Sequence, residues 1–148
     1  MNNYWLTKHE LKQNRYSGVV LIGDKVNKNN RIYPKSVLEK VVEDKQESIR
    51  NRSWICPIDL TSTGVLQLSQ ASHVITKLEM SGSAMVAEIE FLPTPSGNLL
   101  KQMIDSGTKM TLRTLGIGSG RINEDIHLVV GNDYRLEYIC LILAENAA

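Results

Sequence analysis

The chain has 148 residues, enough for one domain with a substantial core, and its 42% hydrophobic and 22% charged residues are typical of a globular protein. Its 17 basic and 16 acidic side chains give a net charge of +1 without a long basic run, which argues against direct binding to nucleic acid. The apolar runs are too short to span a membrane, and residues 1–5 lack the features of a secretory signal. Cys56 and Cys140 form no CxxC pair, so we expect two reduced thiols and no zinc site.

The predicted elements divide the chain into a polar N-terminal arm, residues 1–15, and a single domain, residues 16–148. The first strand is a valine-rich run at 16–22, and an asparagine-rich turn follows at 27–30. A helix is predicted from Pro34 to Arg50, because its valines and leucines recur at helical spacing and proline suits a first turn. Further strands are predicted at 54–58, 74–80, 84–92, 109–112, 126–130 and 134–143, with turns at 116–120 and 131–133.

A second helix is predicted to follow Thr94, whose hydroxyl is placed to cap it, and to stop at Gly107. About seven strands and two helices then occur in an order that is not a regular βαβ alternation. This pattern predicts an α+β domain with mostly antiparallel strands, in which a barrel-like sheet, closed or nearly closed, is flanked by the helices.

Two stretches of the sequence are informative together. Residues 27–38 read NKNNRIYPKSVL, and residues 72–75 read SHVI, followed by a strand, the TPSG of residues 94–97 and a helix. In this order they resemble the prohead maturation proteases of tailed phages, whose N-x-N-G-R-x-Y-P-x-x-V-L segment carries glycine at the position of Asn30. The resemblance covers about residues 16–145 and implies a fold like the assemblin proteases of herpesviruses, in a capsid assembly pathway.

The same resemblance places substitutions at the catalytic positions. Family members carry the general base in a G-E-L-D-H-P segment, whereas residues 56–61 read CPIDLT and put Leu60 at the histidine. They carry the nucleophile in a G-x-S-S-R-G turn, whereas residues 111–116 read TLRTLG and put Arg113 and Thr114 at the two serines. Leucine has no lone pair with which to accept a proton, so these positions predict an inactive protease fold.

Other residues offer little to replace the missing groups. His73 is expected to be a hydrogen-bonded histidine at a strand edge, and His127 a solvent-facing strand residue. Thr114 and Ser119 are candidate nucleophiles only in the sense that each carries a hydroxyl. The GIGSG run at 116–120 lacks the lysine and the helix of a phosphate-binding loop, and no spacing of ligands predicts a metal or cofactor.

The leading hypothesis is therefore a structural protein of the virion, assembled in the host cytoplasm and bound to the major capsid protein as a decoration, cement or minor capsid protein. Tyr4, Trp5 and Leu6 are the candidate capsid contacts, because exposed aromatic residues are common interface anchors. The alternative for these three residues is that they fold back onto the domain. The alternative functions are an active maturation protease with a relocated catalytic set, and a scaffold or core protein of the procapsid.

Overall fold

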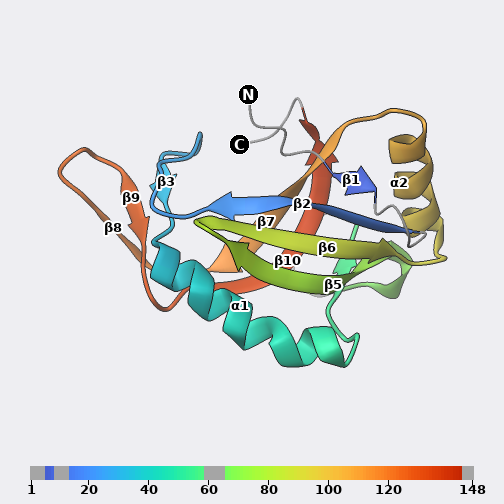
Figure 1. Ribbon diagram of the computed structural model, residues 1–148, viewed down its shortest axis with the longest axis horizontal. Helices are drawn as coiled ribbons and strands as arrows, with labels where there is room; N and C mark the ends of the chain where they lie inside the picture. Colours follow the sequence, from blue (N-terminus) through green and yellow to red (C-terminus); the bar gives the residue numbers. More distant parts are fainter. Residues whose placement is uncertain (1–5, 9–13, 59–65, 145–148) are drawn as a thin grey trace.

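The structure is a computed structural model that describes residues 6–8, 14–58 and 66–144. No helix among these residues is both long and apolar enough to cross a membrane. The elements follow one another along the chain as shown in Figure 1: β1 (Thr7–Lys8), β2 (Arg15–Ile22), β3 (Arg31–Ile32), α1 (Lys35–Arg50), β4 (Ile55–Pro57), the short 3-10 helix η1 (Leu68–Gln70), β5 (Ala71–Ser81), β6 (Ala84–Phe91), α2 (Pro95–Asp105), β7 (Met110–Ile117), β8 (Gly120–Ile122), β9 (Leu128–Val130) and β10 (Arg135–Leu143).

Both predicted helices are present, and their ends have local causes. α1 begins one residue after Pro34, and the side chain of Asp24 accepts a hydrogen bond of 2.9 Å from the free N–H of Lys35. At the start of α2 the hydroxyl of Thr94 accepts the N–H of Gly97 at 3.0 Å, which confirms the predicted cap. After α2 the chain leaves through Gly107, whose φ of +103° is a conformation that glycine adopts without strain.

The largest sheet has five antiparallel strands in the order β1-β2-β6-β5-β4. Along β6 every second side chain is buried, as expected for a strand with one face against the core. The buried side chains of β6 pack with Tyr16 of β2 and with the inner face of α1. The centre of the core is formed by these side chains of β6 and α1: Met85, Ala87, Ile89 and Phe91 from β6, and Val37, Leu38 and Val41 from α1.

The other strands of the described residues form two smaller sheets. β7 pairs with β10 antiparallel, while β9 lies between β3, which is parallel to it, and the antiparallel β8. The α+β class with mostly antiparallel strands and two helices is confirmed. No ladder joins the three sheets within the described residues, however, and single hydrogen bonds connect β7 and β10 to the larger sheet instead. The indole of Trp54 donates to the carbonyl of Glu137 at 2.9 Å, and the N–H of Leu6 donates to the carbonyl of Met110 at 2.8 Å.

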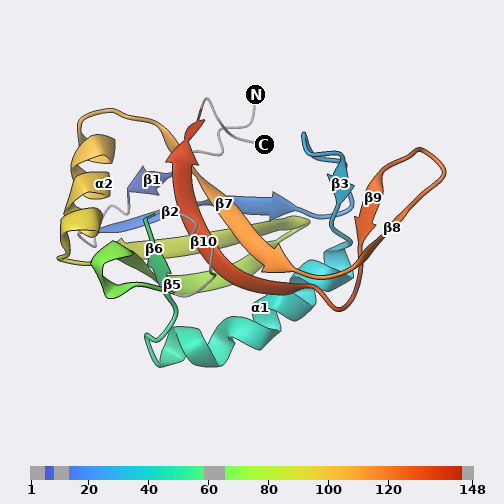
Figure 2. The same cartoon turned by 180° about the vertical axis from the view of Figure 1, so that it is seen from behind.

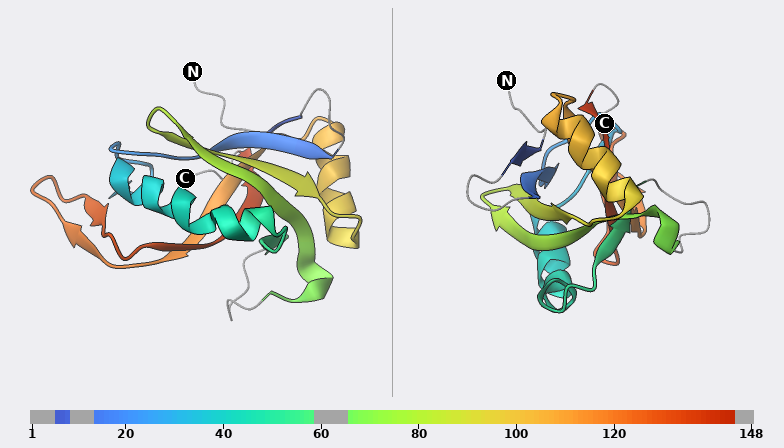
Figure 3. Two further views of the ribbon diagram at one scale, coloured as in Figure 1. Left: turned by 60° about the horizontal axis from the view of Figure 1, so that its bottom comes forward. Right: turned by 90° about the vertical axis from the view of Figure 1, so that its right-hand side faces the viewer.

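The sheets and helices form layers around this core. β7 and β10 cross the back of the five-stranded sheet, as Figure 2 shows. α1 packs against β5, while α2 lies across one end of the sheet (Figure 3). At the opposite end the hairpin of β8 and β9 projects away from the rest of the molecule (Figure 1).

Candidate functional site

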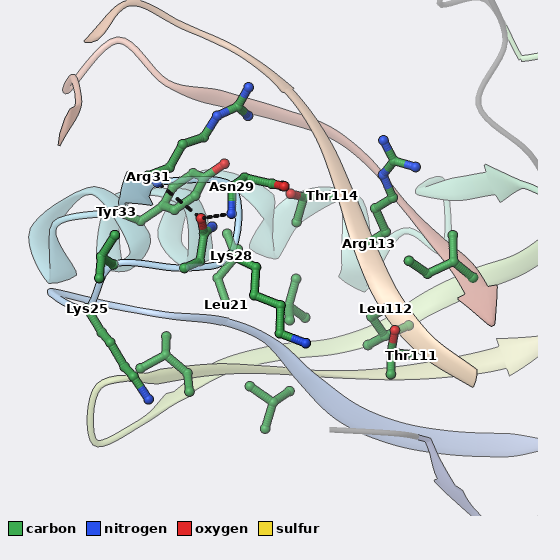
Figure 4. Close-up of a pocket in the computed structure, with 16 residues that line it drawn as sticks. Leu21, Lys25, Lys28, Asn29, Arg31, Tyr33, Thr111, Leu112, Arg113 and Thr114 are labelled. Atoms are coloured by element: carbon green, nitrogen blue, oxygen red, sulfur yellow. Dashed lines mark hydrogen bonds between the residues drawn. The ribbon is translucent and has the colours of Figure 1, made fainter. Parts of the chain in front are cut away.

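A groove of about 660 Å³ lies between β2, β7 and the turn that precedes β3 (Figure 4). Its walls combine the second half of β2 with the first half of β7, and Tyr33 also lines it. The lining residues are Val19, Val20, Leu21, Ile22, Lys25, Val26, Asn27, Lys28, Asn29, Arg31, Tyr33, Thr111, Leu112, Arg113, Thr114 and Ile142.

The predicted asparagine-rich turn forms one wall of the groove. The side-chain oxygen of Asn27 accepts the N–H groups of Asn29 and Arg31, at 2.9 and 3.1 Å. Asn30 has a φ of +61°, a left-handed conformation that asparagine and glycine tolerate better than other residues. This explains physically how asparagine can stand where the resemblance expects glycine. The amide of Asn30 also donates to the carbonyl of Ile126 at 2.7 Å, which ties the turn to the projecting hairpin.

Positive charge is concentrated in this groove although the whole chain is nearly neutral. Lys25, Lys28, Arg31 and Arg113 line it, and no lining residue is acidic. None of these four side chains belongs to a salt bridge within the described part of the chain. Their charges therefore add over a short distance and favour an anionic group in the groove.

The groove also holds a buried hydroxyl without a partner. Thr111 is 6% exposed, and its Oγ1 has no hydrogen-bond partner among the described residues. A buried hydroxyl of this kind costs about 1–3 kcal/mol if nothing satisfies it. Figure 4 shows Thr111 on β7 beside Leu112, below Arg113.

The two residues at the family's nucleophile positions both line the groove from β7. The turn expected at the nucleophile is absent, because residues 111–116 lie within β7. Arg113 pairs with Cys140 and Thr114 with Ile139 in the regular ladder to β10. The sequence prediction ended this strand at Leu112, since the glycines that follow suggested a turn. Gly116 instead makes room for Tyr134, whose ring atoms would lie 2.2–2.4 Å from any Cβ at that position.

Several predicted site residues lie outside the described residues, namely Leu60 with its neighbour Asp59, the candidate contacts Tyr4 and Trp5, and His9. Leu6 lies within the described residues and folds back onto the domain, which was the alternative to a capsid contact. Its side chain is 8% exposed and belongs to the core, while β1, which follows it, pairs with β2. The division of the chain into an arm and a domain stays a prediction.

His73 is fully buried on β5, which lies between β4 and β6, and not at a strand edge as predicted. The expected hydrogen bonding is confirmed: Nε2 lies 2.7 Å from the carbonyl of Ile139 and Nδ1 lies beside the hydroxyl of Ser72. A carbonyl only accepts, so Nε2 carries the proton and Nδ1 accepts from Ser72. The ring is fully buried, and burial lowers the pKa of His73 to about 4.

The other predicted alternatives are also placed by the structure. His127 lies in the turn before β9 and not in a strand, and it does not line the groove. The hydroxyl of Ser119 donates to Asp133 at 2.9 Å, and Gly120 opens strand β8 where a phosphate-binding loop would require a helix. The described residues contain no group of three or more side chains that could hold a metal ion.

Sequence reasoning missed the basic cluster of the groove. Lys25, Lys28 and Arg31 are three residues apart, and that spacing was a visible signal. Arg113 comes from a strand about 80 residues later, so only the fold brings it to the same cavity.

Comparison with known proteins supports the fold and the resemblance. Residues 7–141 match the family described as prohead core protein serine protease. Among solved structures, the chain is similar to the capsid assembly protease gp21 of bacteriophage T4, with a TM-score of 0.80 and 21% identity over 88% of this chain and 81% of that one. A search of curated proteins finds no match. The chain belongs to the prohead core protein serine protease family.

Proposed function

We propose that this chain is a phage capsid assembly protein that uses a protease fold to bind capsid proteins without cleaving them. The observation that carries the proposal is Arg113, which lines the groove from β7 where the resemblance places a nucleophilic serine. A guanidinium stays protonated in proteins and has no lone pair free for attack.

The described histidines support the same conclusion. Activation of a hydroxyl such as that of Thr114 needs a base within hydrogen-bond reach. His73 cannot serve, because it is fully buried and both ring nitrogens are engaged, and His127 does not line the groove. The aligned base position is Leu60, which has no proton-accepting atom.

The groove supports a binding role. Its basic side chains favour an acidic, extended segment of a capsid or core protein, and long-range attraction would come from the groove and not from the net charge of +1. In this proposal the partner is the major capsid protein, and the chain remains in the mature particle as a decoration, cement or minor capsid protein. Tyr4 and Trp5 are proposed as apolar anchors beside the groove's electrostatic contacts.

The decisive experiment combines a chemical probe with a cleavage assay. The purified chain is expected to resist labelling by fluorophosphonates and to leave capsid and scaffold proteins intact after prolonged incubation. Labelling that disappears in Thr114→Ala or Ser119→Ala, but persists in the control Thr108→Ala, would establish an active protease with a relocated catalytic set.

Binding is tested separately with purified particles. Mass spectrometry is expected to find the chain in mature virions, and Arg113→Glu is expected to lower its occupancy while the exposed control Arg50→Glu does not. Replacing Tyr4 and Trp5 together by alanine is expected to lower occupancy across a range of salt. Presence in procapsids but absence from mature particles would favour a scaffold or core protein that leaves.

A further inference from the structure

The projecting hairpin of β8 and β9 presents an open strand edge. β8 lies at the edge of the three-stranded sheet, paired only with β9 among the described strands. The N–H of Gly131 donates to the carbonyl of Ser119, and the N–H of Asn123 donates to the carbonyl of His127. Because hydrogen-bonded pairs alternate in an antiparallel ladder, the backbone groups of Gly120 and Ile122 then face away from β9.

Exposed isoleucines lie on this hairpin and just before it. Ile122 in β8 and Ile126 in the turn are 63% and 72% exposed, and Ile117, which ends β7, is 59% exposed. They are three of the six large hydrophobic residues that are exposed in the described part of the chain. Ile126 adopts a φ of +63°, a conformation that a β-branched residue rarely takes. Its N–H donates to the carbonyl of Asn123 at 3.0 Å, so a tight turn holds this side chain at the tip. The core does not require these exposed isoleucines.

We propose that this edge pairs with the same edge of a second copy of the chain. An antiparallel pair related by a two-fold axis through Ile122 places Ile122 against its own counterpart and buries both side chains. It sets Arg121 opposite Asn123 of the second copy and brings it toward Glu124 and Asp125 at that copy's turn. None of the three charged side chains has a salt bridge within the described residues, so they are available for this contact.

Charge selects this register. The neighbouring two-fold register, with Ile122 opposite Gly120, sets Arg121 directly opposite Arg121, and like charges in that position destabilise a strand pair. Joining the two edges makes one six-stranded sheet from two three-stranded ones. The contact involves a short strand, so it falls well below the roughly 1,600 Å² of a standard interface, and we expect a weak dimer.

The test is sedimentation velocity of the full chain from about 10 µM to about 1 mM. The average mass is expected to rise toward twice that of the monomer across this range. Ile122→Lys is expected to weaken dimerisation at least tenfold, because it places two like charges at the two-fold axis. The control Leu99→Lys makes the same kind of change at another exposed aliphatic residue, Leu99 of α2, which is 51% exposed. It is expected to leave dimerisation unchanged. Circular dichroism confirms that each variant is folded.

A charge exchange identifies the occupant as a second copy. Arg121→Asp is expected to weaken dimerisation, and the double variant Arg121→Asp with Asp125→Arg is expected to restore it, since each copy then carries both reversed charges. A mass that stays monomeric at all concentrations overturns the proposal. Failure of the double variant to restore association also overturns it, as does association that Ile122→Lys leaves unaltered. None of these outcomes depends on whether the groove cleaves or binds peptides.

Discussion

The buried imidazole of His73 makes stability depend on pH in a predictable direction. The ring is neutral in the folded chain, with a pKa of about 4, whereas an unfolded chain takes up the proton near the ordinary value of 6.5. Between these values the unfolded state binds more protons, so the free energy of unfolding falls as the pH falls. Each tenfold difference in proton affinity is worth about 1.4 kcal/mol, which gives a loss of about 3 kcal/mol by pH 4. The contribution is fully present above pH 6.5.

Urea denaturation at pH 7.5 and at pH 4.5, followed by tryptophan fluorescence, measures this loss. Protonation of Glu90 and Asp105, whose pKa values neighbouring cations and hydrogen bonds lower, adds its own decrease mainly below about pH 4.5. The contribution of His73 is therefore the difference between the chain and His73→Gln, in which the side-chain amide can still donate to the carbonyl of Ile139. We expect the pH-dependent loss to shrink by about 2 kcal/mol in that variant.

His127→Gln is the matched control, because it makes the same substitution outside the buried core and outside the groove. NMR of the His73 ring gives a measurement that needs no variant: the ring should stay neutral at pH 5.5, with the proton on Nε2. A ring that titrates near 6.5 in the folded chain, or identical pH dependence in His73→Gln, would refute the reasoning.

Three further predictions concern stability, each measured by urea denaturation. Gly116→Ala is expected to destabilise the fold by about 2–3 kcal/mol, because its Cβ would overlap the ring of Tyr134, and unchanged stability would contradict that packing. Tyr16→Phe removes a hydroxyl that donates to Asp105 at 2.6 Å, so we expect a loss of about 1.5 kcal/mol, and a smaller loss in an Asp105→Asn background. Ile126→Gly is expected to raise stability by about 0.5–1 kcal/mol, since relief of the left-handed strain exceeds the added entropy of the unfolded chain, and a net loss would show that the turn is not strained.

The sequence predicted the elements whose signals are local. α1 has apolar residues at helical spacing, and α2 has Thr94 before it and Gly107 after it. In each case a few neighbouring residues determine the backbone conformation. The two-residue strands β1 and β3 carry no such signal, because strands of that length exist only through their partners.

Long-range pairing limited the prediction of the candidate site. Gly116 and Gly118 suggested a turn, yet β7 continues through Gly116 because β10 supplies a ladder and Tyr134 occupies the space of the missing side chain. The burial of His73 likewise depends on β10, whose Ile139 lies 66 positions away. The resemblance selected Arg113 and Thr114 as the nucleophile positions but expected them in a turn, and the structure places both in β7. The other groove cations, Lys25, Lys28 and Arg31, lie about 80 positions earlier, so only the fold brings them near Arg113.

The strand order also determines when the core can form during synthesis. Ile22, the last residue of β2, pairs with Ala84, the first residue of β6, 62 positions later. At about 5–20 residues per second the ribosome needs roughly 3–12 s to add that segment. During this interval the edge of β2 that later pairs with β6 has no partner, and an unpaired apolar strand favours association between nascent chains. Nascent chains on one polysome lie close together, so β2 of each chain is exposed to the same strand of its neighbours until β6 emerges.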